Sequence, residues 1–180
     1  MIRRMMRWLI WGSCAIWLVA CGRTETGQPA PTATPVTISQ WAVAADASSA
    51  FGKPDWSPAR ATGAPEIDAC VDDSRAWASA RGGGVEWLEL TYAQPVFATE
   101  VEVYQTLGRG AVSRVSLIDV EGNETIIWEG TDVTEPCPGT LAVAVPQTAY
   151  RVRGVRIDLD ESRTGYWNQI DAVALIGVRP

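Results

Sequence analysis

Hydrophobic and polar residues alternate along most of the chain from residue 38 to residue 180. The alternating segments are short, rich in β-branched and aromatic residues, and separated by Gly, Pro, Asn and Asp, as is typical of strands with one buried face. Helical periodicity is weak throughout this region. The pattern therefore predicts an all-β domain of about eight strands, at the spacing of a β-sandwich.

The expected strands are residues 41–45, 85–92, 99–105, 113–119, 125–129, 141–145, 155–159 and 170–178. In the second of these, Leu88, Leu90 and Tyr92 share one face, which we expect to lie in the core. One helical turn is expected at residues 57–61, where Pro58 takes the first helical position.

The first twenty residues have a different pattern. Arg3, Arg4 and Arg7 precede an uncharged and mostly apolar run over residues 8–20. This run is shorter than the roughly 20 residues that a membrane-spanning helix needs, and it suits the hydrophobic part of a signal peptide. Residues 1–20 are therefore predicted to be a cleaved export signal.

The signal ends in Leu-Val-Ala-Cys-Gly at residues 18–22. This segment resembles the bacterial lipobox, in which the cysteine thiol receives a diacylglyceryl group and the chain is cut just before it. The resemblance implies that Cys21 is lipidated and that the mature chain is an extracytoplasmic lipoprotein of a bacterial cell membrane. An ordinary secretory signal and an uncleaved short anchor are the alternatives.

Residues 22–37 are rich in Pro and Thr and have almost no large apolar side chains. Such a segment cannot bury enough surface to offset the chain entropy lost on folding. We therefore expect residues 21–37 to form a tether that starts at the lipidated cysteine, and residues 38–180 to form a single domain.

The net charge of the chain excludes some classes of binding partner. The chain has 15 basic and 21 acidic residues, and loss of the three signal-peptide arginines leaves 12 against 21, a net charge of −9. An acidic domain without a basic stripe argues against nucleic acid and against adsorption to anionic headgroups. The lipid at Cys21 is then the expected link to the membrane.

Of the four cysteines, Cys14 leaves with the signal and Cys21 takes the lipid, so that Cys70 and Cys137 remain. An even remainder in an oxidising compartment predicts one disulfide. Two free thiols and a pair of metal ligands are the alternatives. The sequence has no histidine and no Cys-x-x-Cys motif, which disfavours a zinc site.

The absence of histidine also removes Ser-His-Asp and Cys-His catalysis. Paired carboxylates of the glycosidase type could come only from acidic stretches such as residues 66–73. Such a stretch in a loop is usually solvated surface. We therefore expect a binding domain and no enzyme.

Several short motifs follow one another along the chain in a characteristic order. They are Ser48-Ser49, Phe51-Gly52, Trp56-Ser57-Pro58, Ala61-Thr62-Gly63-Ala64-Pro65, Glu86-Trp87-Leu88-Glu89-Leu90 and Trp167-Asn168-Gln169-Ile170-Asp171. Together they resemble the discoidin-type (coagulation-factor type C-like), galactose-binding-like domains of bacterial surface and secreted proteins, over residues 41–178. The resemblance implies a jelly-roll β-sandwich of two antiparallel sheets with ligand loops at one end. Members bind glycans, phospholipid headgroups or proteins, so the fold leaves the function open.

Many members of that family hold a structural calcium in the region that corresponds to residues 66–74 of this chain. An acidic residue on the last strand completes the calcium site. The candidate ligands are Asp68, Asp72, Asp73 and Asp171, since calcium prefers clustered oxygen ligands. The alternative is that a disulfide at Cys70 staples this region in place of the metal. No other cofactor is required.

Aromatic residues supply the candidate ligand contacts. Trp77, Trp87, Trp128 and Trp167 lie in or beside strands, and we expect them in the core. Arg109 and Tyr166 lie in better-placed loops and, with Trp56, are the candidate ligand-binding residues. A carbohydrate-binding module is the first hypothesis, and a protein-docking or scaffold domain at the cell surface is the alternative. The latter needs a broad exposed apolar patch.

Overall fold

The computed structural model describes residues 34–133 and 135–179. The expected signal peptide, Cys21 and most of the expected tether lie outside the described residues. The strands are β1 (Val36–Trp41), β2 (Ala44–Ala47), β3 (Trp77–Ala78), β4 (Val85–Leu107), β5 (Val112–Asp119), β6 (Glu124–Glu129), β7 (Gly139–Ala144), β8 (Arg151–Asp160) and β9 (Gln169–Arg179). Two 3-10 turns, η1 (Pro58–Ala61) and η2 (Glu161–Arg163), complete the elements. The all-β prediction is confirmed.

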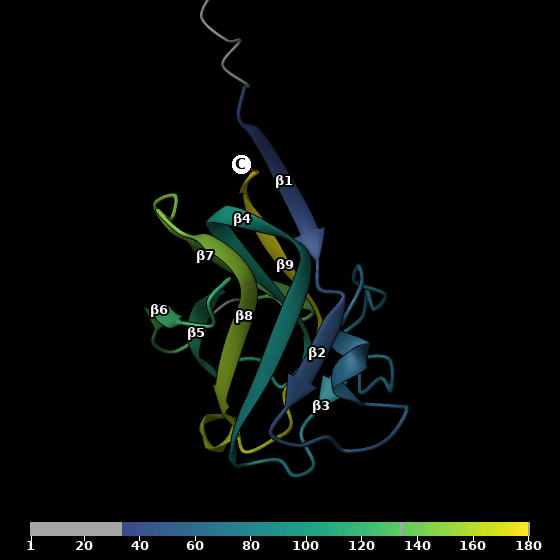
Figure 1. Ribbon diagram of the computed structural model, residues 1–180. Helices are drawn as coiled ribbons and strands as arrows, with labels where there is room; N and C mark the ends of the chain where they lie inside the picture. The colour runs from purple at the N-terminus through teal and green to yellow at the C-terminus, as the bar shows by residue number, and fades with distance from the viewer. Residues whose placement is uncertain (1–33, 134, 180) are drawn as a thin grey trace, which may run out of the picture. The chain divides into compact units, whose positions relative to one another are not determined.

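The strand β4 joins the two layers of the sandwich. Its first half pairs with β2 and β8, and β8 continues through β5 to β6. Its second half pairs with β7 and β9, and β9 also pairs with β1 and β3. All of these pairings are antiparallel. Figure 1 shows β4 running alongside β8 and then turning over at the end of the domain.

The prediction of separate strands at 85–92 and 99–105 was wrong, because both are parts of β4. The residues between them carry turn-like signals, Gln94-Pro95, that suggested a break. The backbone instead stays extended, and its pairing with β8 changes register between Thr91 and Val96. Such an irregularity bends a strand and lets it pass from one sheet to the other.

Near the start of the domain the structure has two strands where one was predicted. β1 pairs with β9 as far as Trp41, and β2 then pairs with β4. Between the two strands, the Val43 amide donates to the Thr91 carbonyl at 2.8 Å. The first strand, β1, begins at Val36, two residues before the expected domain start at residue 38. The last residues of the expected tether therefore belong to the sheet.

The core follows the predicted alternation. Leu88, Leu90 and Tyr92 are buried, and the side chains between them are more exposed. Full burial of one such large apolar side chain stabilises the fold by roughly 1.5–3 kcal/mol. Among the tryptophans expected in the core, Trp77 is fully buried, whereas Trp87 is half-buried on the outer face, with the Arg156 guanidinium 4.7 Å from its ring centroid. Alternation decides the face of a strand, but only the second layer decides which faces are covered.

The predicted helical turn is present as η1, with Pro58 in its first turn and Ser57 at the N-cap position. The Ser57 hydroxyl makes no cap hydrogen bond and donates to the Pro54 carbonyl at 2.7 Å instead. Among the described residues, the structure contains no helix with the length and hydropathy needed to cross a bilayer.

Both ends of β4 lie at the same end of the domain, because Val85 pairs with Asp160 and Leu107 pairs with Gln169. η2 and the residues after it connect β8 to β9 at this end. A disulfide between Cys70 and Cys137 ties two further loops together here and confirms the predicted pairing. The loops that hold the candidate site are thus cross-linked on a rigid sandwich.

Candidate functional site

A hollow opens where β4 ends and β9 begins. Its volume is about 80 Å³, below the roughly 300 Å³ of pockets that enclose small molecules, so that it can hold one face of a ligand but cannot surround it. We call it the aromatic hollow, because four of the side chains that line it are aromatic. Its lining residues are Phe51, Trp56, Asp72, Ala78, Leu107, Tyr166, Trp167 and Gln169.

The four aromatic rings contact one another edge to face. The Phe51 ring lies 5.2 Å from the Trp56 ring at 74° and 5.9 Å from the Trp167 ring at 86°. The Tyr166 ring meets the Trp167 ring at 5.6 Å and 88°. Phe51 and Tyr166 are 53% and 49% exposed. Large rings that stay this exposed do not serve the core, and they mark a surface that can bind a ligand.

Trp56 is held in an unusual backbone conformation. Its φ is 51°, in the left-handed region, which is costly for a bulky residue and persists only where the surroundings enforce it. Its amide donates to the Ser74 carbonyl at 3.0 Å, and its carbonyl accepts from the Ala78 amide at 3.3 Å. Its indole N–H donates to Asp72 Oδ1 at 3.2 Å. The ring is therefore fixed at the edge of the hollow.

Trp167 is fixed from two sides. Its indole N–H donates to the Ser79 carbonyl at 3.1 Å. On the other side Gly108 packs directly against its backbone, and a Cβ at Gly108 would lie 1.8 Å from the Trp167 carbonyl oxygen. Gly108 also has a φ of 60°, which glycine adopts without steric cost. Only glycine permits this approach.

Asp72 and Gln169 supply the polar groups of the hollow. The Gln169 amide nitrogen donates to Asp72 Oδ1 at 2.6 Å, and its oxygen accepts from the Asp73 backbone amide at 3.0 Å. Asp72 Oδ1 also accepts from the Trp56 indole. Within residues 34–133 and 135–179, no hydrogen bond reaches Asp72 Oδ2. This carboxylate oxygen can accept a hydrogen bond from a ligand.

A buried polar network lies behind the hollow. The Gln105 amide donates to Asp132 at 2.6 Å and accepts from the Asn168 side chain at 2.8 Å. The Asn168 backbone amide donates to Glu161 at 3.2 Å, and the Ser79 hydroxyl donates to the same carboxylate at 2.9 Å. Burial raises the pKa of Glu161. These bonds join the end of β4 to three connecting segments, one of which carries Trp167.

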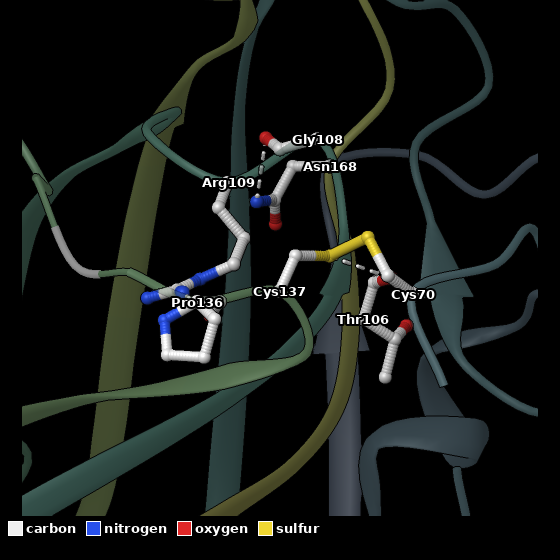
Figure 2. The surroundings of a disulfide bond; sticks show 7 residues. All are labelled: Cys70, Thr106, Gly108, Arg109, Pro136, Cys137 and Asn168. Atoms are coloured by element: carbon white, nitrogen blue, oxygen red, sulfur yellow. Dashed lines mark hydrogen bonds between the residues drawn. A yellow bond between two sulfur atoms is a disulfide. The ribbon is translucent and has the colours of Figure 1, made fainter. Parts of the chain in front are cut away.

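Arg109, a predicted ligand contact, does not line the aromatic hollow. Figure 2 shows its side chain running toward Pro136, next to the disulfide between Cys70 and Cys137. Its Nη1 donates to the Pro136 carbonyl, and its Nε and Nη2 are buried without a partner among the described residues. The Arg109 guanidinium is therefore buried against the loop that contains Pro136 and does not face the aromatic hollow.

Trp56 and Tyr166, the other predicted contacts, do line the hollow. The prediction missed Phe51, Trp167 and Gln169. Trp167 was expected in the core because it precedes a strand. The signal for these residues was available, since a large aromatic residue within a turn-rich segment is unusual unless it packs or binds.

Two of the four carboxylates expected to bind calcium are engaged in other contacts. The Arg75 side chain donates to Asp73 at 2.6 Å and lowers the pKa of that carboxyl. Asp171 is buried and accepts from the backbone amides of Glu66 and Ile67 at 2.9 and 3.0 Å; burial raises its pKa.

The remaining two candidates are no closer to a metal site. Asp72 faces the aromatic hollow, and Asp68 is exposed. In the part of the chain that the structure describes, no three Asp, Glu or Cys side chains form a group suited to a metal ion. The residues therefore do not fit the calcium site implied by the resemblance, and Asp171 instead ties the 66–67 backbone to β9.

The sequence model of the pappalysin-1 C-terminal SD scarf domain matches residues 32–179. The chain belongs to this family. A comparison with curated protein sequences found no match.

Solved structures similar to this scarf domain include carbohydrate-binding modules. The CBM32 of AlyQ in complex with 4,5-unsaturated mannuronic acid has a TM-score of 0.57 and 18% identity, and covers 77% of this chain and 97% of its own. Chitosan-binding module 1 from the chitosanase/glucanase of Paenibacillus sp. IK-5 has a TM-score of 0.52 and 19% identity, with coverages of 74% and 94%.

Truncated AlyQ, with its CBM32 and alginate lyase domains, has a TM-score of 0.55 and 18% identity over 82% of this chain. The present chain spans 35% of that protein's length. These similarities confirm the predicted fold, a galactose-binding-like jelly-roll sandwich of the discoidin type.

Proposed function

We propose that this chain is a membrane-anchored extracytoplasmic lipoprotein whose domain binds carbohydrate without catalysis, at the aromatic hollow. One observation carries the proposal: the exposed rings of Phe51 and Tyr166 and the hydrogen-bonded indoles of Trp56 and Trp167 line one hollow. In the same hollow, one carboxylate oxygen of Asp72 has no hydrogen-bond partner among the described residues. A sugar ring has an apolar C–H face and polar hydroxyl edges. The rings can pack against the face while Asp72 accepts from a hydroxyl.

The fold similarity supports the same class of ligand. Chitosan and mannuronic acid are named as the ligands of two modules that share the sandwich. Because function resides in the site and not in the fold, the hollow carries the weight of the proposal.

The lining of the hollow favours binding over hydrolysis. Glycoside hydrolysis uses two carboxyl groups about 5–9.5 Å apart on either side of the bond. Asp72 is the one carboxylate among the residues that line the hollow.

The binding test uses the full chain, purified in a detergent that has no sugar headgroup, on a glycan array and by titration calorimetry. We expect Trp167→Ala and Tyr166→Ala each to weaken binding about tenfold or more, as loss of a stacked ring of ~1–3 kcal/mol implies. Trp87→Ala is the matched control, since this half-buried tryptophan does not line the hollow. Its binding should be unchanged.

Absence of binding to every glycan on the array would overturn the carbohydrate proposal. Saturable binding of a purified surface protein instead, lost in the same hollow variants, would establish the docking alternative.

The anchor has its own test, because Cys21 lies outside the described residues. We expect the chain to incorporate a radiolabelled fatty acid in a bacterial host and to fractionate with the membrane. Cys21→Ser should lose the label, whereas Cys14→Ser, a cysteine of the expected signal, should keep it. Label that persists in Cys21→Ser would exclude this anchor.

A further inference from the structure

The charge of the aromatic hollow is one-sided. Among its lining residues Asp72 is the only acidic side chain, and none is Lys or Arg. Of the cations in the adjoining loops, Arg75 pairs with Asp73, Arg163 pairs with Asp160, and Arg109 donates to the Pro136 carbonyl. Arg81, in the loop after β3, does not line the hollow. Lys53, the closest cation in sequence to Phe51, does not line the hollow. An anionic ligand would therefore meet a carboxylate without a compensating cation.

The hydrogen bonds of Asp72 leave its second oxygen for a donor. Both N–H groups that reach it, from Trp56 and Gln169, end on Oδ1 at 3.2 and 2.6 Å. Among the described residues, Oδ2 has no such bond. A charged N–H donor makes a stronger hydrogen bond to a carboxylate than a neutral hydroxyl does.

The aromatic rings beside Asp72 also attract a positively charged group. Trp56, which donates to Asp72, is flanked by Phe51, and Trp167 lies on the other side of Phe51. Aromatic faces attract cations through the ring quadrupole, and Trp does so most strongly. A cationic group in the hollow gains from the carboxylate and from the rings together.

We infer that the hollow selects sugars with a free, protonated amine, such as an unacetylated glucosamine unit, over neutral sugars and over uronic acids. This inference rests on the proposed carbohydrate-binding function. The sugar ring packs on the aromatic side chains, and its ammonium group donates to Asp72 Oδ2.

The test compares three oligosaccharides of equal length against the full chain by titration calorimetry: a glucosamine tetramer, its N-acetylated counterpart and a uronic acid tetramer. The pH is kept where the free amine is protonated. We expect the glucosamine tetramer to bind about tenfold more tightly than the acetylated one, and the uronic acid tetramer to bind least. Raising the salt concentration should reduce this preference in the unaltered chain.

Two aspartate variants separate local charge from net charge. Asp72→Asn keeps an acceptor for Trp56 and Gln169 but removes the charge, and it should abolish the preference for the amine. Asp68→Asn removes the same charge from an exposed position of the same loop that does not line the hollow, and it should retain the preference. An equal loss in both variants would mean that net charge is responsible and would overturn the inference.

The remaining outcomes are distinguishable. Equal affinity for the free and acetylated tetramers, with no effect of salt, would overturn amine selection and leave carbohydrate binding intact. Binding of none of the three, nor of any glycan on the array, would overturn carbohydrate binding itself. Choline that competes as well as the amino sugar would show recognition of ammonium without recognition of the sugar, and would also overturn the inference.

Discussion

The aromatic hollow can be compared with a second depression, which we call the charged groove. The groove is the larger of the two, with a volume of about 270 Å³ against about 80 Å³ for the hollow. The residues that line the groove are Val85, Ser113, Arg114, Glu129, Asp158, Asp160 and Arg163. Size alone would therefore favour the groove as the ligand site.

Four of the charged side chains that line the groove form ion pairs with one another. Arg114 pairs with Asp158 at 2.9 Å, and Arg163 pairs with Asp160 at 3.2 Å. Arg156 adds a second pair to Asp158 at 3.0 Å. A ligand would have to displace these partners, whereas the hollow offers exposed rings and an open acceptor. A candidate ligand site is therefore recognised by exposed groups that have no partner within the protein, and not by its volume.

The largest expected effect concerns the disulfide, which braces the loop that carries Asp72. The bond closes a loop of 67 residues, so its removal should lower the free energy of unfolding by up to roughly 4 kcal/mol. Urea denaturation of the Cys70→Ser/Cys137→Ser variant measures this. Ligand affinity should fall with it, because Cys70 lies two residues from Asp72. An unchanged denaturation midpoint would show that the bond does not brace the loop.

Trp56 sharpens the comparison further, since none of the residues that line the groove has a left-handed backbone. Trp56→Ala and Trp56→Gly should both weaken binding by about ten- to a hundredfold, because each removes a ring and a donor to Asp72. The glycine variant should be the more stable by about 1 kcal/mol, because its φ of 51° costs glycine nothing. Calorimetry gives the affinity and thermal unfolding gives the stability.

Variants of the groove should have smaller effects. The Arg114 side chain is 37% exposed, and its largely buried partner Asp158 keeps Arg156 as a second cation. An ion pair with one exposed member and a remaining cation should contribute about 1 kcal/mol. We expect Arg114→Ala to change stability by no more than this and to leave glycan affinity untouched. If Arg114→Ala weakens glycan binding as much as Trp167→Ala does, the groove and not the hollow is the site.

The smallest effect is the pH dependence of stability due to two carboxyls, Glu161 behind the hollow and Asp160 in the lining of the groove. Burial raises the pKa of Glu161, behind the hollow. The folded state then binds this proton more tightly than the unfolded state does, so its contribution to stability falls as pH rises above the ordinary glutamate pKa. The stability of the unaltered chain should therefore decline, relative to Glu161→Gln, as pH rises from about 4 to 7.

In the groove the sign is reversed. The hydroxyl of Ser162, and then Arg163, lower the pKa of Asp160. Its contribution is present above the ordinary aspartate pKa and is lost as pH falls through the folded value. Relative to Asp160→Asn, the unaltered chain should lose stability on acidification. Parallel slopes for the two variants would contradict this contrast.

The alternating pattern alone determined the fold class and the buried face of the strands. Leu88, Leu90 and Tyr92 are buried as predicted, because side-chain direction along a strand is a local property with a period of two. The cysteine count predicted the disulfide, because the domain has only Cys70 and Cys137 and a single pairing is possible between them. Trp56 and Tyr166 could be proposed as ligand contacts because aromatic residues in turn-rich segments stand out.

Only the tertiary structure decided which strands pair and which side chains lie together. That residues 85–107 form one strand, and that Trp87 faces outward while Trp77 is enclosed, depends on which sheet each half of β4 joins. The hollow combines side chains from loops more than a hundred residues apart in sequence. The same packing directs Arg109 to Pro136, gives Asp72, Asp73 and Asp171 separate partners, and leaves Asp68 exposed. These environments arise from non-local strand pairing and loop cross-links, and a one-dimensional pattern of polar and apolar residues carries no information on either.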